Sequence, residues 1–101
     1  MDAVDVFRHK GKYFAILQET ERSQVGVMTI GPGREAGPVE AHAADQVFLV
    51  LEGEAEIRVS DQTRRVGPGH SVLVPARTPH HVRSVGEVPL FFYTVYAPPA
   101  Y

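Results

Sequence analysis

Four side chains in this sequence carry donor atoms of the kinds that bind divalent metal ions in proteins: Glu40, His42, Gln46 and His80. Glu40 and His42 stand two residues apart, so their side chains point to the same side of an extended segment. Gln46 can approach that side at the start of the next strand. The sequence contains no cysteine, so only nitrogen and oxygen atoms could hold a metal. Many surface strands carry Glu and His at this spacing, so the pair alone also fits a solvated surface.

The segments that must position these residues have the pattern of an all-β protein. Apolar residues come in short clusters rich in Val, Ile, Phe and Tyr, which Gly and Pro interrupt at close intervals. Residues 55–60 alternate between apolar and polar side chains, which indicates a strand with one face in water. The predicted strands are residues 4–8, 13–19, 24–30, 46–51, 55–60, 63–66, 71–74, 80–85 and 90–96.

One predicted strand is apolar on both faces. Residues 47–51 read Val-Phe-Leu-Val-Leu, a pattern typical of a strand that is covered on both sides by its own chain or by a second subunit. We therefore expect a homodimer. Residues 31–38 form the longest irregular stretch and lead into Glu40, so we place them at the mouth of a pocket. Residues 97–101 contain two prolines and are expected to be a surface tail.

Composition excludes several classes of protein. The 101 residues fit one domain, 1–101, with one modest core. A formal net charge of -2 gives no reason to expect a nucleic-acid partner. The first residues lack the basic and then apolar order of a signal peptide, and no apolar run approaches the about 20 residues of a membrane-spanning helix. We expect a cytoplasmic protein with no membrane partner.

The spacing of residues in the second half of the chain resembles a motif of the cupin superfamily. That motif reads Gly, five residues, Pro-x-Gly-x-x-His, and it aligns on Gly69, Pro75 and His80. Two positions depart from it, because Arg77 stands where Gly is usual and Ser84 where Asn is usual. We predict that a strand ends at Pro75 and that a short turn follows it. His80 then lies at the start of the next strand.

The first cupin motif resembles the region around the other three donors. It reads His-x-His, three or four residues, Glu, six residues, Gly, and it aligns on Glu40, His42, Gln46 and Gly53. The resemblance covers residues 24–96, and the short stretch between the motifs suits the compact microbial cupins. Here Glu replaces the first His and Gln replaces the Glu. The formal charge of the donor set is conserved, while the carboxylate moves to a different position.

The resemblance implies a fold and a cofactor. The fold is a small jelly-roll β-barrel, or double-stranded β-helix, of two antiparallel sheets with a metal pocket between them. By the same resemblance, the N-terminal strands within residues 1–20 are expected to pair with a second subunit. The implied ligands are Glu40, His42, Gln46 and His80, and they suit one divalent ion among Zn, Mn, Fe and Ni without selecting between them.

Two functions remain open at this point. The first is a metalloenzyme that acts on a small polar molecule by oxygenase-type or isomerase-type chemistry. The second is a non-catalytic module that binds or senses a small ligand, because a fold does not decide between the two. No separate general base stands out, although Glu40 could act as one if it is not a ligand.

Three further residues have two interpretations each. Arg77 could hold a substrate carboxylate at the rim of the pocket, or it could be a solvated residue on a turn. Phe48 could line the pocket or belong to the core. Asp45 is an alternative carboxylate, but it would face opposite to Gln46 on a regular strand, and the spacing to Gly53 favours Gln46.

Overall fold

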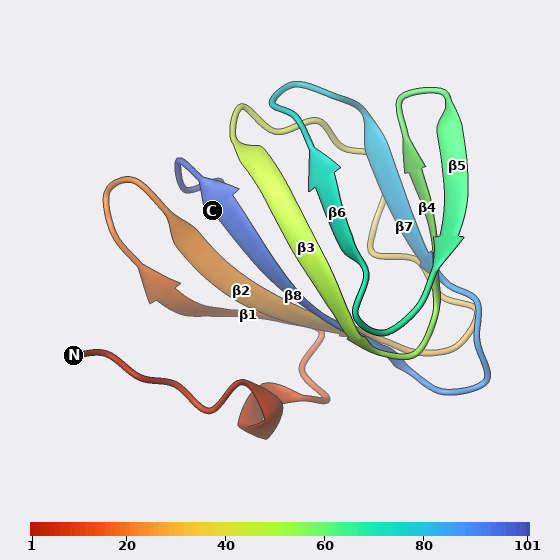
Figure 1. Ribbon diagram of the computed structural model, residues 1–101, viewed down its shortest axis with the longest axis horizontal. Helices are drawn as coiled ribbons and strands as arrows, with labels where there is room; N and C mark the ends of the chain where they lie inside the picture. Colours follow the sequence, from red (N-terminus) through yellow and green to blue (C-terminus); the bar gives the residue numbers. More distant parts are fainter.

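The computed structural model describes residues 1–101, and its strands form two antiparallel sheets that face each other (Figure 1). One sheet has five strands in the order β1-β2-β8-β3-β6, and the other has three in the order β5-β4-β7. Eight of the nine predicted strands are confirmed, with ends that differ by one residue at most. Their bounds are β1 Phe14–Glu19, β2 Gln24–Ile30, β3 Asp45–Glu52, β4 Ala55–Val59, β5 Gln62–Val66, β6 Ser71–Val74, β7 His80–Ser84 and β8 Leu90–Ala97.

The predicted jelly roll of two antiparallel sheets is confirmed, but the two sheets do not close into a barrel. No strand of one sheet pairs with a strand of the other. The reason lies in the loop 31–44, which runs beside the free edge of β7 and forms isolated bridges with it, Glu35 with Arg83 and Glu40 with His80. This loop satisfies the backbone groups on that edge, so no strand of the five-stranded sheet can pair there.

The prediction of a strand at residues 4–8 is wrong. Val6–His9 form a short 3-10 helix, η1, and it is the only helix of the chain. The ring of Phe7 packs edge-on against Phe91 of β8 with a centroid distance of 5.5 Å. The N-terminal segment is therefore held by side-chain packing on the outer face of the five-stranded sheet and adds no strand to it. No helix in this chain could span a membrane.

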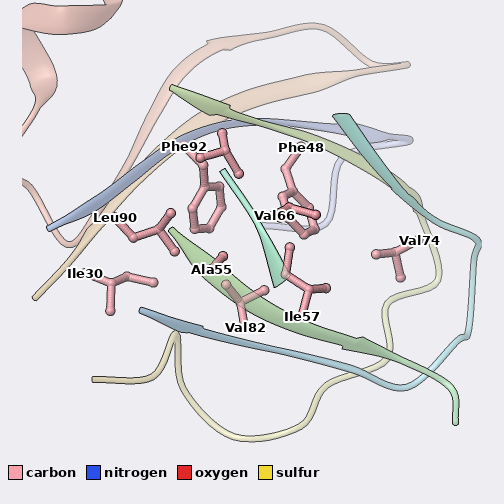
Figure 2. Packing of buried hydrophobic residues seen from close by; sticks show 10 residues of the cluster. Ile30, Phe48, Ala55, Ile57, Val66, Val74, Val82, Leu90 and Phe92 are labelled. Atoms are coloured by element: carbon pink, nitrogen blue, oxygen red, sulfur yellow. The ribbon is translucent and has the colours of Figure 1, made fainter. Parts of the chain in front are cut away.

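The hydrophobic core fills the space between the two sheets (Figure 2). Phe48 of β3 and Phe92 of β8 lie next to each other in it, with ring centroids 5.2 Å apart. Each fully buried side chain of this size stabilises the fold by about 1.5–3 kcal/mol. The core residues are Ile30, Phe48, Val50, Ala55, Ile57, Val66, Val74, Val82, Leu90 and Phe92.

Strand register places a row of polar side chains at one end of this core. Gln46 of β3 lies opposite Tyr96 of β8, Tyr96 lies opposite Gln24 of β2, and Gln24 lies opposite Glu19 of β1. Residues opposite one another in a sheet share a face, so the whole row belongs to the inner face. We call Gln46, Tyr96, Gln24 and Glu19 the polar row.

The turn between β3 and β4 depends on Gly53. This residue has a φ of +79°, and a Cβ atom there would lie 2.5 Å from the carbonyl oxygen of Pro89 and 2.8 Å from the Cα of Leu90. Only glycine allows the two backbone segments to approach so closely. Gly33, with a φ of +78°, has open space around the same position.

We expect Gly53→Ala to lower the free energy of unfolding by about 3 kcal/mol or more, because it adds a backbone clash to the cost of a left-handed residue. Gly33→Ala is the matched control. It meets no neighbour and should cost only about 1–2 kcal/mol. Urea denaturation of both variants measures the difference, and equal losses would contradict the importance of the close approach.

The outer face of the five-stranded sheet carries an apolar row in four strands. Leu73 lies opposite Val47, Val47 opposite Val95, and Val95 opposite Val25. Leu73 is 61% exposed and Val47 is 39% exposed. We propose that a second copy of the chain covers this row in a homodimer.

Leu73→Asp should weaken this dimer at least about tenfold, because each subunit would bury a charge in place of a large apolar side chain. Val88→Asp is a suitable control, since Val88 is 56% exposed and lies outside the sheets. Sedimentation velocity over a concentration series gives the association constants. A wild-type protein that stays monomeric throughout would contradict the proposed dimer.

Candidate functional site

A cavity of about 270 Å³ lies between the two sheets at the end where the polar row begins. All four predicted metal donors line it, although they come from the loop 31–44, from β3 and from β7. Its apolar wall includes Phe14, Met28, Val82 and Phe92. The polar lining residues relevant to its chemistry are Glu40, His42, Gln46, His80, Tyr96 and Tyr101.

His80 is the first residue of β7 and is held firmly in the cavity wall. Its backbone exchanges two hydrogen bonds with Glu40, with N–O distances of 2.8 and 3.1 Å. Its ring Nδ1 lies 3.1 Å from the carbonyl oxygen of Thr78. A carbonyl only accepts hydrogen bonds, so Nδ1 carries a hydrogen in that bond, and in the neutral ring Nε2 keeps its lone pair. Nε2 of His80 could therefore bind a metal ion through this lone pair.

Glu40 and His42 contact each other in the cavity. Glu40 Oε2 lies 3.3 Å from His42 Nε2, and the rings of His42 and His80 are 5.2 Å apart. Burial lowers the pKa of His42 below its ordinary value of 6.5, the neighbouring His80 lowers it further, and the carboxylate of Glu40 opposes both. His42 is therefore held in the neutral form, which is the form that binds metals.

Gln46 presents an amide oxygen with no partner. Its Nε2 donates to Thr94 Oγ1 at 3.0 Å and to the hydroxyl of Tyr96 at 3.4 Å. Its Oε1 is buried and accepts no hydrogen bond, which costs about 1–3 kcal/mol for a buried polar atom. A bound ligand or metal could satisfy this atom. Asp45 lies on the opposite face, where its Oδ1 accepts a hydrogen bond from the N–H of Ala76.

The donor atoms are of the kinds that bind a divalent metal, but they are not placed as the ligands of one ion. They offer two imidazoles, one carboxylate and one unpaired amide oxygen, all at one cavity. However, no three His, Asp or Glu side chains of the chain are placed so that they could hold a metal ion. The expected four-ligand centre is therefore not assembled among these side chains.

The two predicted substrate contacts, Arg77 and Phe48, do not line the cavity. Arg77 is exposed on the turn before β7, and its N–H donates to the carbonyl oxygen of His42. Its φ of +61° explains why glycine suits this position of the motif. Phe48 is 1% exposed and packs against Phe92 in the core.

Two tyrosines that were not among the predicted site residues also line the cavity. Tyr96 belongs to the polar row, and burial raises its pKa. Tyr101, from the expected surface tail, is 58% exposed, and its ring also packs against Phe14 and His42, with centroid distances of 5.0 and 5.5 Å. Burial, then Tyr96 and Glu40, raise the pKa of Tyr101 far above its ordinary value, so its hydroxyl stays protonated. Alternation along β8 could have indicated Tyr96, whereas nothing local marks Tyr101.

Comparison with known proteins gives consistent matches. The family model described as "Cupin domain" matches residues 26–96. An uncharacterised protein of Streptomyces coelicolor is 34% identical over 89 residues, which cover 88% of this chain and 82% of that protein. A solved structure from Bacillus halodurans has a TM-score of 0.88 and 30% identity, and the match covers 93% of this chain and 76% of that one.

A further relative is much longer than this chain. Mannose-1-phosphate guanylyltransferase ManC of Salmonella typhimurium is 28% identical over 86 residues. These residues are 85% of this chain but only 18% of the enzyme. The chain therefore corresponds to a small part of that protein.

We expect Glu40→Gln to lower the pKa of His42 further, because the carboxylate is the neighbour that raises it. A pH titration of the His42 ring resonances by NMR measures the change. A rise in this pKa would contradict the arrangement described above.

The same pKa predicts a dependence of stability on pH. The pKa of His42 in the folded protein lies below the unfolded value of 6.5. The stabilising contribution of the neutral His42 ring to the free energy of unfolding is therefore fully present above pH 6.5. It is lost as the pH falls through the pKa of the folded state. The free energy of unfolding should therefore fall more steeply in this window for the wild type than for His42→Gln. Parallel curves in urea denaturation would contradict it.

Proposed function

The chain belongs to the cupin family of domains, and we propose that it is a metal-binding cupin that acts on a small polar molecule in the cavity between its sheets. One observation carries this proposal. Four nitrogen and oxygen donors from separate segments line a single cavity: Glu40, His42, Gln46 and His80. Imidazole, carboxylate and amide oxygen together suit Zn, Mn, Fe or Ni.

Each donor would have a distinct part in holding the ion. His80 would bind through Nε2, since its Nδ1 is held by Thr78. His42 would bind as the neutral imidazole that its lowered pKa favours. Gln46 would contribute the buried Oε1 that has no other partner. Glu40 would supply the only negative charge among the four. When bound, the metal would supply Lewis-acid or oxygen-activating chemistry.

The cavity limits the substrate to a small molecule. Its volume of about 270 Å³ is below the usual range of roughly 300–1,000 Å³ for ligand pockets. The lining contains no Lys or Arg, so an anionic group would find its positive partner only in the metal. The apolar wall formed by Met28, Val82 and Phe92 suits a compact apolar part of the molecule. Reaction types of the oxygenase and isomerase kinds both fit these features.

A second function, non-catalytic binding or sensing of a small ligand, is favoured by one specific observation. The Glu40 carboxylate already contacts His42 Nε2 at 3.3 Å and accepts a hydrogen bond from Tyr101 at 3.2 Å. Both contacts reach Oε2, so this oxygen is satisfied without a metal. In this case the cavity would hold a neutral ligand by hydrogen bonds to Gln46 and the tyrosines.

Metal analysis of protein purified without a chelating tag tests the first function. We expect close to one metal per chain in the wild type, and an affinity at least about 100-fold lower in His42→Ala, His80→Ala, which removes both imidazoles. His9→Ala is the matched control, because His9 contacts only Lys12 outside the cavity. A wild type without metal affinity would overturn the metalloenzyme and leave the binding module.

Oxygen uptake then separates the reaction types. Diketones, phenols and sugars would be offered to the metal-loaded protein, because oxygenase chemistry consumes dioxygen and isomerase chemistry does not.

A further inference from the structure

Residues 98–101 follow β8 and are anchored to β2 by a single side chain. Gln24, which is 1% exposed, donates from Nε2 to Glu19 Oε2 at 2.7 Å and to the carbonyl oxygen of Tyr101 at 2.6 Å. Its Oε1 accepts from the N–H groups of Ala100 at 3.1 Å and Tyr101 at 3.0 Å. Both hydrogens and both lone pairs of this amide are used. We call residues 98–101 the strap.

The strap places Tyr101 between aromatic rings at the edge of the cavity. Its ring lies 5.0 Å from Phe14, 5.4 Å from Tyr96 and 5.5 Å from His42 between centroids. Its hydroxyl donates to Glu40 Oε2 at 3.2 Å. The ring contacts come from three separate segments, β1, β8 and the loop 31–44, so the position of the hydroxyl is fixed independently of the Glu40 side chain.

Glu40 has few other restraints on its side chain. It lies in the loop 31–44, and its side chain is 40% exposed. Its only side-chain contacts of a polar kind are His42 Nε2 at 3.3 Å and the Tyr101 hydroxyl, and both reach the same oxygen, Oε2. Oε1 is left without a protein partner, so the carboxylate is oriented through one oxygen while the other stays available.

We propose that Tyr101 is a positioning residue for the Glu40 carboxylate, and that Gln24 fixes Tyr101 in place through the strap. The role of the carboxylate as a ligand rests on the function proposed above, whereas the orientation of Glu40 does not. Hydrogen bonds to ligating carboxylates contribute about 10–100-fold to metal affinity. Tyr101 acts through Glu40 and does not itself take part in the chemistry.

Two variants and one control test this role. Tyr101→Phe removes the hydroxyl but keeps the ring and all backbone bonds, and Gln24→Leu releases the strap with a side chain of similar size. Tyr93→Phe is the control, because Tyr93 lies opposite Leu49 on the outer face of the sheet. The first readout is the NMR resonance of the Glu40 carboxyl carbon in metal-free protein. The second is Co²⁺ affinity, together with the visible absorption spectrum of the Co²⁺ complex.

Tyr101→Phe should shift the Glu40 resonance, weaken Co²⁺ binding about tenfold and alter the spectrum. Gln24→Leu should do the same and speed hydrogen exchange at the amides of Ala100 and Tyr101, while Tyr93→Phe should change nothing. An unchanged resonance in Tyr101→Phe, or a shifted resonance with unchanged Co²⁺ affinity, would overturn the proposal. If Gln24→Leu does not fold, Tyr101→Phe decides alone.

The two proposals fail in different ways. A wild type that takes up no Co²⁺ would overturn the metal-binding function. The Glu40 resonance would still decide the positioning role in that case, since it is recorded without metal. A shift in Tyr101→Phe would support it, and no shift would overturn it.

Discussion

The structure depends on the register of the five-stranded sheet, which decides which side chains face the space between the sheets. β8 lies between β2 and β3, and its pairing puts Tyr96 beside Gln46 and Gln24 on the inner face. Along β8 from Tyr96 towards Phe92, every second side chain faces the space between the sheets. At Phe92 this inner face is apolar and belongs to the hydrophobic core. A slip of one residue would turn all of them outward. The core and the cavity are therefore two consequences of one pairing.

Backbone pairing also explains why distant residues meet at the site. Glu40 and His80 are joined by two backbone hydrogen bonds, so their proximity does not depend on side-chain attraction. The orientation of each side chain has a separate cause: Thr78 holds the ring of His80, and Thr94 and Tyr96 hold the amide of Gln46. The scaffold is thus rigid where it presents the imidazole of His80 and the amide, and it is least constrained at the carboxylate.

Much of this was predictable from the sequence, and the exceptions share a physical cause. Apolar clusters and turn residues predicted eight strands because these signals are local, whereas the placement of four donors at one cavity was implied by the resemblance to the two cupin motifs. The helix Val6–His9 was missed because its position depends on Phe7 packing against Phe91. The site role of Tyr101 was missed because its anchor, Gln24, is 77 positions away. The periodicity of apolar residues along the sequence carries no information about contacts between such distant residues.

The exchange of residues in the first motif connects these observations. Resemblance to the cupin pattern places a carboxylate at position 46, on β3, where neighbouring strands would fix it. In this chain position 46 is an amide held by Thr94, and the carboxylate is Glu40, in a loop. Moving the charge from a strand to a loop conserves the formal charge but removes the restraint that the strand would give. An outside restraint is then needed, and the hydroxyl of Tyr101, anchored through Gln24, is placed to supply it.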